Sequence, residues 1–283
     1  MSGLIKPKKS LGQNFLVDDR VIGRIIDAVS PLPEEIVVEI GPGKGALTRS
    51  LVVRAGFVLA VEIDARLAAH LKERFNSENF LLVEADALTL DWGKLVGRAS
   101  EMFGRIRHKN AYGSRARVVA NLPYYISTPI VERLITSGRV FDDLTLMLQK
   151  EVVERITSGP GSKDYGYLSV LVQYHTDAMK LFDVPPSSFR PAPKVWSSVV
   201  RLRMRAHPPI VVDDEGRFFA MVRAAFAQRR KTLANNLKAS MRVPGIEGGI
   251  EGVFERAGIE PRRRAETLSV EEFGTLYREL HKN

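Results

Sequence analysis

Apolar residues in the first third of the chain recur with two spacings. Short apolar runs, each bounded by glycine, proline or charged residues, predict buried strands over 36–40, 57–63 and 80–83. Apolar residues at helical spacing predict helices over 18–29, 46–54 and 66–75. Strands that alternate with helices of this length indicate βαβ units, a parallel sheet and right-handed crossovers.

The alternation continues to about residue 204. Its elements are a strand that ends at Asn121, a strand over 144–148, and helices over 129–137, 151–157 and 167–174. The less regular stretch from 87 to 117 predicts a helix and a basic loop that carry Arg98, Arg105, Arg107, Lys109, Arg115 and Arg117. Two further strands, over 178–184 and 195–204, flank a proline-rich segment and are expected to form an antiparallel pair at a sheet edge.

A domain boundary is predicted at His207-Pro208-Pro209. Beyond it, apolar residues follow helical spacing over 218–239, 250–257 and 270–280. We therefore expect an α/β domain over residues 1–206 and a small all-α domain over residues 207–283.

Composition narrows the class of protein. Of the 283 residues, 45% are hydrophobic and 27% are charged, which is typical of a soluble globular protein. Cysteine is absent, which excludes disulfides, thiolate nucleophiles and cysteine metal sites, and the five histidines show no metal-ligand spacing. No apolar stretch approaches the ~18 residues of a membrane span, and the basic N-terminus lacks the apolar core of a secretory signal. We expect a cytoplasmic protein without metal or membrane partners.

Positive charge is concentrated in the last third of the chain. From Phe189 onward there are 18 Lys and Arg against 11 Asp and Glu, whereas the first 188 residues hold 24 against 22. Two clusters stand out, Arg229-Arg230-Lys231 and Arg262-Arg263-Arg264. Clusters of this density neutralise phosphates and give salt-dependent binding to nucleic acid. A solvated arginine-rich surface is the alternative.

Ligand-binding residue types follow three predicted strands, at the edge where open α/β sheets bind ligands. The loop Gly41-Pro42-Gly43-Lys44-Gly45 has G-x-G-x-G spacing, which fits a bound nucleoside better than the G-x-G-x-x-G of NAD-binding loops. Glu62, at the end of the second strand, can accept hydrogen bonds from both hydroxyls of a ribose. Asp86, after the third strand, can accept one from an adenine amino group. A plain βα turn is the alternative for the glycines.

The segment Asn121-Leu122-Pro123-Tyr124 is suited to a flat base with an exocyclic amine. Pro123 holds Leu122 extended, so the Leu122 carbonyl can face a pocket beside the Asn121 side-chain oxygen. Two acceptors can take both hydrogens of an amino group, and a base can stack on Tyr124. Phe189 could form the opposite wall. The alternatives are a turn with a buried asparagine, and a Phe189 that packs in the core.

Six segments together resemble one known family. They are 10–16 (SLGQNFL), 39–45 (EIGPGKG), 121–127 (NLPYYIS), 189–195 (FRPAPKV), 229–233 (RRKTL) and 264–269 (RAETLS). Through them the chain resembles the KsgA/RsmA-type small-subunit (16S) rRNA adenine N6-dimethyltransferases over nearly its whole length. It departs from the family in a longer, basic stretch between Asp86 and Asn121 and in Ala120, where glycine is expected.

The resemblance implies a Rossmann-like seven-stranded methyltransferase sheet, its last strand antiparallel, with a small all-α C-terminal domain. It implies S-adenosyl-L-methionine as methyl donor and dimethylation of N6 on two adjacent adenosines near the 3′ end of 16S rRNA, in the small subunit or its precursor, with a role in subunit biogenesis. The expected residues at the cofactor are Gln13, Asn14, Leu16, Gly41, Gly43, Glu62, Asp86 and Asn121. Asn121, Leu122, Tyr124 and Phe189 are expected at the target base, and the high charge favours a monomer.

Three other functions remain as alternatives. A large-subunit rRNA methyltransferase of the erythromycin-resistance type shares the N-terminal motifs, but 231–233 and 266–268 favour the small-subunit class. A mainly non-catalytic ribosome-assembly factor would have no need of the intact glycine loop, Glu62, Asp86 and Asn121. The glycine spacing disfavours an NAD-dependent oxidoreductase.

Overall fold

The chain divides into two compact units. The computed structural model describes residues 5–107, 116–240 and 249–282. Unit 1 comprises Met1–Val153 and Met179–Met204, and unit 2 comprises Glu154–Ala178 and Arg205–Asn283. Residues 154–178, which we expected in the α/β domain, therefore pack with the helical unit. No helix in the three described stretches is long and apolar enough to cross a membrane.

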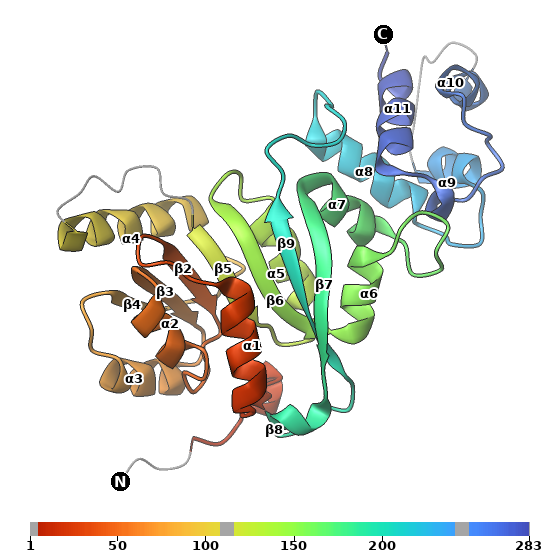
Figure 1. Cartoon of the computed structure of the whole chain (residues 1–283). Helices are drawn as coiled ribbons and strands as arrows, with labels where there is room; N and C mark the ends of the chain where they lie inside the picture. Colours follow the sequence, from red (N-terminus) through yellow and green to blue (C-terminus); the bar gives the residue numbers. More distant parts are fainter. Residues whose placement is uncertain (1–4, 108–115, 241–248, 283) are drawn as a thin grey trace. The chain divides into compact units, whose positions relative to one another are not determined.

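Unit 1 is built on a seven-stranded sheet (Figure 1). In sheet order the strands are β4 (Phe80–Glu84), β3 (Phe57–Glu62), β2 (Ile36–Ile40), β5 (Ala116–Asn121), β6 (Phe141–Gln149), β9 (Ser197–Met204) and β7 (Thr176–Val184). The first five are parallel, and β9 runs antiparallel to β6, with Leu146 opposite Val200. The predicted parallel sheet with an antiparallel final strand is confirmed.

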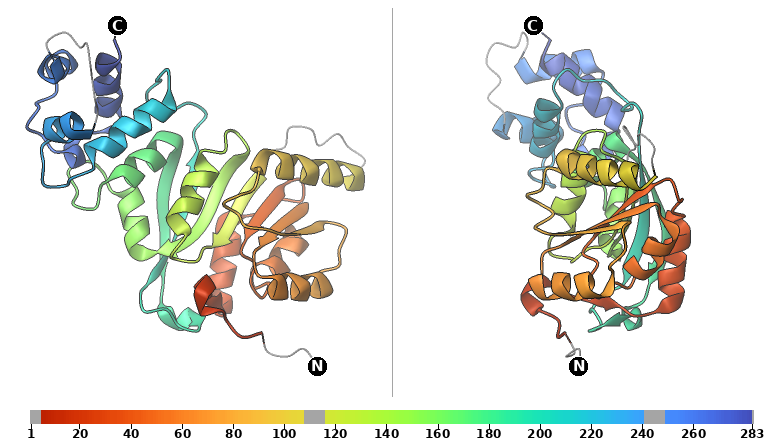
Figure 2. Two further views of the ribbon diagram at one scale, coloured as in Figure 1. Left: turned by 180° about the vertical axis from the view of Figure 1, so that it is seen from behind. Right: turned by 90° about the vertical axis from the view of Figure 1, so that its left-hand side faces the viewer.

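Helices cover both faces of this sheet, as the side view in Figure 2 shows. They are α1 (Asp19–Val29), α2 (Thr48–Arg54), α3 (Ala65–Arg74), α4 (Trp92–Arg107), α5 (Ser127–Ile135) and the start of α6 (Lys150–Thr157). Ile22 of α1 and Leu51 of α2 belong to one buried cluster with Val37 of β2. On the opposite face, Phe103 of α4 packs against Phe57 of β3, with ring centroids 6.2 Å apart. Because both faces are covered, ligands have access to the sheet at its edges.

A short two-stranded ribbon joins the N-terminal segment to the proline-rich loop. A 3₁₀ turn, η1 (Lys9–Leu11), precedes β1 (Phe15–Leu16), and β1 pairs antiparallel with β8 (Phe189–Arg190) after η2 (Pro186–Ser188). The Val17 N–H also donates to the Ser188 carbonyl at 2.9 Å. This ribbon fixes the N-terminal segment on unit 1.

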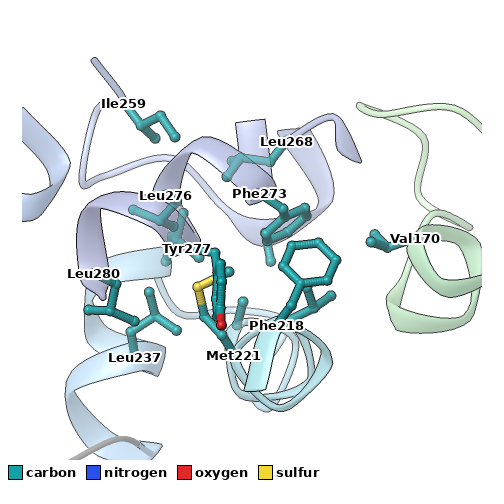
Figure 3. Packing of buried hydrophobic residues seen from close by; sticks show 14 of the residues in the cluster. Val170, Phe218, Met221, Leu237, Ile259, Leu268, Phe273, Leu276, Tyr277 and Leu280 are labelled. Atoms are coloured by element: carbon teal, nitrogen blue, oxygen red, sulfur yellow. The ribbon is translucent and has the colours of Figure 1, made fainter. Parts of the chain in front are cut away.

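Unit 2 has its own hydrophobic core (Figure 3). Its helices are α7 (Tyr167–His175), α8 (Glu215–Ala225), α9 (Leu233–Ser240), α10 (Gly249–Ala257) and α11 (Val270–Leu280), with the 3₁₀ turn η3 (Ala265–Thr267) before α11. Phe218 and Met221 of α8 pack with Phe273 and Tyr277 of α11, and all four are at most 1% exposed.

The single helix predicted over 218–239 is wrong, because α8 and α9 are separate helices. The side chain of Asn236, 3% exposed, donates to the carbonyl oxygens of Ala225 at 2.6 Å and Gln228 at 3.0 Å. These bonds satisfy backbone acceptors where α8 ends and so stabilise the break.

Candidate functional site

A cavity at the carboxyl edge of the sheet gathers the predicted site residues. Its walls come from the N-terminal segment, the glycine loop and the ends of β3, β4 and β5. The predicted residues that line it are Gln13, Asn14, Leu16, Gly41, Gly43, Glu62, Asp86, Asn121, Leu122 and Tyr124. The topology thus brings five separate segments of unit 1 to one place.

The glycine loop needs its glycines for two different reasons. Gly43 has φ +59°, and a Cβ there would lie 3.2 Å from the ring of Phe15 at the cavity. Gly45 has φ +80°, and a Cβ there would lie 2.6 Å from Phe75. The second glycine therefore lets the loop pass close to the Phe15 ring at the cavity, whereas the third allows the loop to pack closely against the end of α3.

Glu62 is held in a fixed orientation at the end of β3. Only 4% exposed, it accepts hydrogen bonds from the backbone N–H groups of Gly43 (3.1 Å) and Asp64 (2.9 Å). Burial raises the pKa of this carboxyl. Asp86 accepts from the Leu88 N–H at 2.9 Å after β4. The two carboxylates line one cavity, as binding of a ribose and an adenine requires.

Glu39 also lines the cavity, and we assigned it no role from the sequence. It is 2% exposed, and the Thr48 hydroxyl donates to its carboxyl at 2.6 Å. Burial, together with the nearby charge of Glu62, raises the pKa of Glu39 to about 8. The available signal was a carboxylate inside an apolar strand, directly before the glycine loop.

Asp64 secures the N-terminal segment across the site; we call residues 8–16 the N-terminal strap. The Asp64 carboxylate accepts hydrogen bonds from Arg66 (2.7 Å), Gln13 (3.1 Å) and Lys8 (3.1 Å). The Arg66 guanidinium, followed by Gln13 and Lys8, holds the pKa of Asp64 well below its usual range. The Gln13 side-chain oxygen meanwhile accepts from the Lys8 N–H at 2.8 Å. Gln13 therefore lies at the cavity wall with its amide engaged by the protein.

The strap also fixes Asn121. The Asn121 side-chain N–H donates to the Asn14 carbonyl at 3.1 Å, which leaves the side-chain oxygen as the acceptor of that amide. The Leu122 N–H donates to the Met147 carbonyl at 3.2 Å. Within the described residues, the Leu122 carbonyl accepts no hydrogen bond. The Asn121 side-chain oxygen and the Leu122 carbonyl, on consecutive residues, thus remain available as hydrogen-bond acceptors.

Tyr124 forms part of the wall next to these acceptors. It is partly buried, and its hydroxyl lies 2.6 Å from the hydroxyl of Ser197 on β9. Burial raises the pKa of Tyr124, so the phenol stays neutral at physiological pH.

Phe189 does not line the cavity. Its side chain is 1% exposed and packs in the unit 1 core, while its backbone pairs with Leu16. The structure therefore does not form the expected sandwich of a base between Tyr124 and Phe189. An aromatic residue in a proline-rich loop gives the same sequence pattern whether it packs in the core or contacts a ligand.

The basic clusters of unit 2 differ in whether their side chains form ion pairs within the protein. Arg229, Arg230 and Lys231 are exposed in the turn between α8 and α9, and Arg229 donates to the Lys163 carbonyl. Arg263 instead forms a bidentate pair with Glu272, in which Nη2 lies 3.0 Å from Oε2.

Arg262 and Arg264, beside Arg263, are exposed. The first cluster and these two arginines can therefore meet phosphates, whereas Arg263 holds unit 2 together.

The basic stretch over 98–117 is only partly described. Arg98 and Arg105 are exposed on α4. Arg117 pairs with Glu35 at 3.0 Å and donates to the Val29 carbonyl at 2.8 Å. Lys109 and Arg115 lie outside the described residues.

Fold and site together define a class of protein. The strand order and the cavity at the carboxyl edge of the sheet are the features of a Rossmann-like methyltransferase. Residues 5–282 match the sequence model of the family described as ribosomal RNA adenine dimethylase. The chain belongs to this family, whose enzymes methylate adenine in ribosomal RNA. The predicted resemblance is confirmed.

Known relatives match nearly the full length. Proteins named ribosomal RNA small subunit methyltransferase A from Pelotomaculum thermopropionicum and Moorella thermoacetica are both 47% identical, over 96% and 98% of this chain and 90% and 93% of theirs. A dimethyladenosine transferase structure from Plasmodium falciparum is 25% identical with a TM-score of 0.74, over 93% of this chain and 95% of that one. The structure of the 23S rRNA methyltransferase ErmE is 27% identical with a TM-score of 0.67, over 95% and 100%.

Proposed function

We propose that this enzyme uses S-adenosyl-L-methionine to dimethylate N6 of two adjacent adenosines near the 3′ end of 16S rRNA. The substrate is the small subunit or its precursor, and the enzyme acts as a cytoplasmic monomer in subunit biogenesis. One observation carries the proposal: a single cavity joins Glu62 and Asp86, which suit a nucleoside, to Asn121, Leu122 and Tyr124, which suit an amine-bearing base.

The residues of the cavity fit this cofactor. The buried Glu62 carboxylate, held by two backbone N–H groups, is positioned to accept the ribose hydroxyls. Asp86 is positioned to accept from the adenine amino group, and Gly43 lets the loop pass close to the Phe15 ring at the cavity. When bound, the cofactor supplies a methyl group that its sulfonium already activates.

Asn121 and Leu122 prepare the target amine. The N6 lone pair of adenine is delocalised into the ring, so a planar amino group is a poor nucleophile. Acceptance of its hydrogens by the Asn121 side-chain oxygen and the Leu122 carbonyl favours a tetrahedral nitrogen with a free lone pair. Because both acceptors are fixed before the base arrives, catalysis depends on positioning and electrostatics.

Tyr124 holds the base that these acceptors bind. A target adenosine has to leave its stack, at a cost of a few kcal/mol, and stacking on an aromatic face offsets ~1–3 kcal/mol of it. The Tyr124–Ser197 hydrogen bond keeps the ring in place. The amine becomes acidic as the new bond forms, so its proton needs no dedicated base.

Radiolabelled methyl transfer to unmethylated small and large subunits tests the function. We expect label in small subunits alone, recovered as N6,N6-dimethyladenosine after nucleoside analysis. Label in large subunits would instead favour an enzyme of the erythromycin-resistance type. Stable binding to immature small subunits without label would indicate a non-catalytic assembly factor.

A further inference from the structure

Trp196 is an exposed aromatic side chain with no packing role that explains it. Its side chain is 51% exposed, whereas Trp92, the only other tryptophan in the sequence, is 2% exposed. Val195 beside it is 44% exposed. Large aromatic side chains are normally buried, and adjacent exposed apolar residues mark a surface that binds a ligand or another macromolecule.

The backbone of Trp196 is held next to the candidate active site. The Trp196 carbonyl accepts a hydrogen bond from the Lys150 N–H at 2.9 Å, at the end of β6. The next residue, Ser197, contacts the Tyr124 hydroxyl at 2.6 Å. All of these residues belong to unit 1. Trp196 is therefore one residue along the chain from a direct contact with Tyr124, which lines the cavity.

The segment that carries Trp196 suits a polyanion. Residues 185–197 contain no Asp or Glu, and Arg190 and Lys194 are exposed. Within the described residues neither cation forms an ion pair with a carboxylate, since the Arg190 guanidinium donates only to the carbonyls of Ser187 and Phe189. Exposed aromatic faces beside free positive charges are how proteins bind unpaired RNA.

Trp196 lies outside the cavity that we propose for the target base. Trp196 is not among the residues that line the cavity, whereas Asn121, Leu122 and Tyr124 are. A base whose amine reaches Asn121 therefore contacts Tyr124, and the exposed indole is free for a second base.

We propose that Trp196 stacks on the nucleotide next to the target adenosine, outside the cavity, while Arg190 and Lys194 meet the adjoining phosphates. This inference rests on the proposed function and specifies its RNA-binding face. The indole stabilises the neighbouring nucleotide in the unstacked form that the target must adopt. It supplies the second aromatic contact that the buried Phe189 does not provide.

Fluorescence tests the contact directly, because Trp196 is the more exposed of only two tryptophans. The full-length protein is titrated with a short single-stranded RNA that contains two adjacent adenosines, and binding is followed in parallel by anisotropy of the labelled RNA. We expect RNA to quench the wild-type emission and to protect it from acrylamide, and Trp196→Phe to show neither effect. Saturated RNA binding with unchanged wild-type emission and acrylamide quenching would overturn the proposal.

Kinetics on unmethylated small subunits test the consequence. We expect Trp196→Ala to lower kcat/KM about 10-fold, Trp196→Phe to restore most of the loss, and cofactor affinity and Tm to be unchanged in both. Val53→Ala, which removes another exposed apolar side chain of unit 1 (81% exposed), is the control and should transfer methyl groups normally. A Trp196→Ala enzyme with wild-type kcat/KM would refute the role.

The two proposals fail in different ways. If the wild-type enzyme methylates small subunits but Trp196 is neither quenched nor needed, only the stacking contact is wrong. If the wild-type enzyme methylates no subunit, the proposed function is wrong, and the fluorescence titration still decides whether Trp196 contacts RNA.

Discussion

At the residue scale, the two ends of the Asn121 amide have different tasks. Its N–H group is engaged by the Asn14 carbonyl, so its oxygen is the end available to a substrate. We predict that Asn121→Ala lowers single-turnover methyl transfer by about 100-fold or more, the usual cost of removing a preorganised hydrogen-bonding group. Cofactor affinity, measured by calorimetry, should change by less than about 3-fold, because Glu62 and Asp86 remain in place.

Asn121→Asp is the matched variant for this prediction. Aspartate keeps an acceptor but cannot donate to the Asn14 carbonyl, so we expect a rate above that of Asn121→Ala and below that of wild type. Equal losses of transfer and cofactor affinity in Asn121→Ala would show that Asn121 only supports the structure.

Glu39 gives a second prediction at this scale, through the pH dependence of stability. Its pKa is about 8 in the folded protein against an ordinary value of 4.5, so the folded state binds the proton more tightly than the unfolded state. The protonated carboxyl therefore stabilises the fold below pH 4.5, and this stability is lost as the pH rises toward 8. We expect Glu39 to account for a fall of about 2–4 kcal/mol in the free energy of unfolding across this window.

Urea unfolding of wild type and Glu39→Gln at both ends of the window isolates this effect. Glutamine keeps an acceptor for the Thr48 hydroxyl and does not titrate, so its free energy of unfolding should decline less with pH than that of wild type. Parallel pH profiles for the two proteins would contradict the burial of an ionisable Glu39.

At the scale of elements, the N-terminal strap links the cofactor side of the cavity to the target side. Asp64 holds Lys8 and Gln13, and Asn14 in turn holds Asn121. We predict that Asp64→Ala loosens the strap, so that residues 8–14 exchange amide hydrogen faster and cofactor affinity falls about 10-fold. Loss of a buried carboxylate with several donors costs on the order of 2 kcal/mol or more of stability as well.

The control for the strap is Asp27→Ala. Asp27 pairs with Arg54 at 3.2 Å on an exposed surface, so its removal should change neither strap exchange nor cofactor affinity. Unchanged hydrogen exchange over residues 8–14 in Asp64→Ala would show that the β1–β8 ribbon alone holds the strap.

Elements of unit 1 were predictable because burial imposes their periodicity. The continuous apolar run of β2 and the spacing of Val21, Ile22, Ile25 and Ile26 in α1 follow directly from a covered sheet. The β1–β8 ribbon was not predictable, since it joins two-residue strands that lie far apart in the sequence. The break between α8 and α9 was missed because it depends on the buried amide of Asn236.

The site was predictable where the topology fixes it. Parallel strands end at one edge of the sheet. Glu62, Asp86 and Asn121 therefore line the same cavity, regardless of the sequence that separates them. Contacts between residues far apart in the sequence leave no such pattern. The hydrogen bonds from Lys8 and Gln13 to Asp64, and the burial of Glu39, appear only in the folded chain. Phe189 was misplaced for the same reason, because its loop sequence does not reveal which way the ring faces.

At the scale of the whole molecule, most of the net positive charge lies in the last third of the sequence. Its two basic clusters differ in whether they form ion pairs within the protein. Arg229, Arg230 and Lys231 are exposed and form no described pair with a carboxylate, whereas Arg263 is committed to Glu272. A cation that is already paired releases few counterions when it meets a phosphate. The exposed turn between α8 and α9 therefore offers more to RNA than 262–264, although the two clusters look alike in the sequence.

We predict that replacing Arg229, Arg230 and Lys231 together by alanine weakens binding to small subunits and lowers the slope of log K against log salt by about 2–3. Arg263→Ala is the contrasting variant: it should lower the free energy of unfolding by about 1 kcal/mol, because its pair with Glu272 is partly exposed to solvent, and leave the salt slope nearly unchanged. Cofactor affinity should be normal in both, since the cavity belongs to unit 1. Subunit binding measured over a range of salt concentrations decides between the clusters, and an unchanged slope in the triple variant would exclude this turn as the RNA-docking surface.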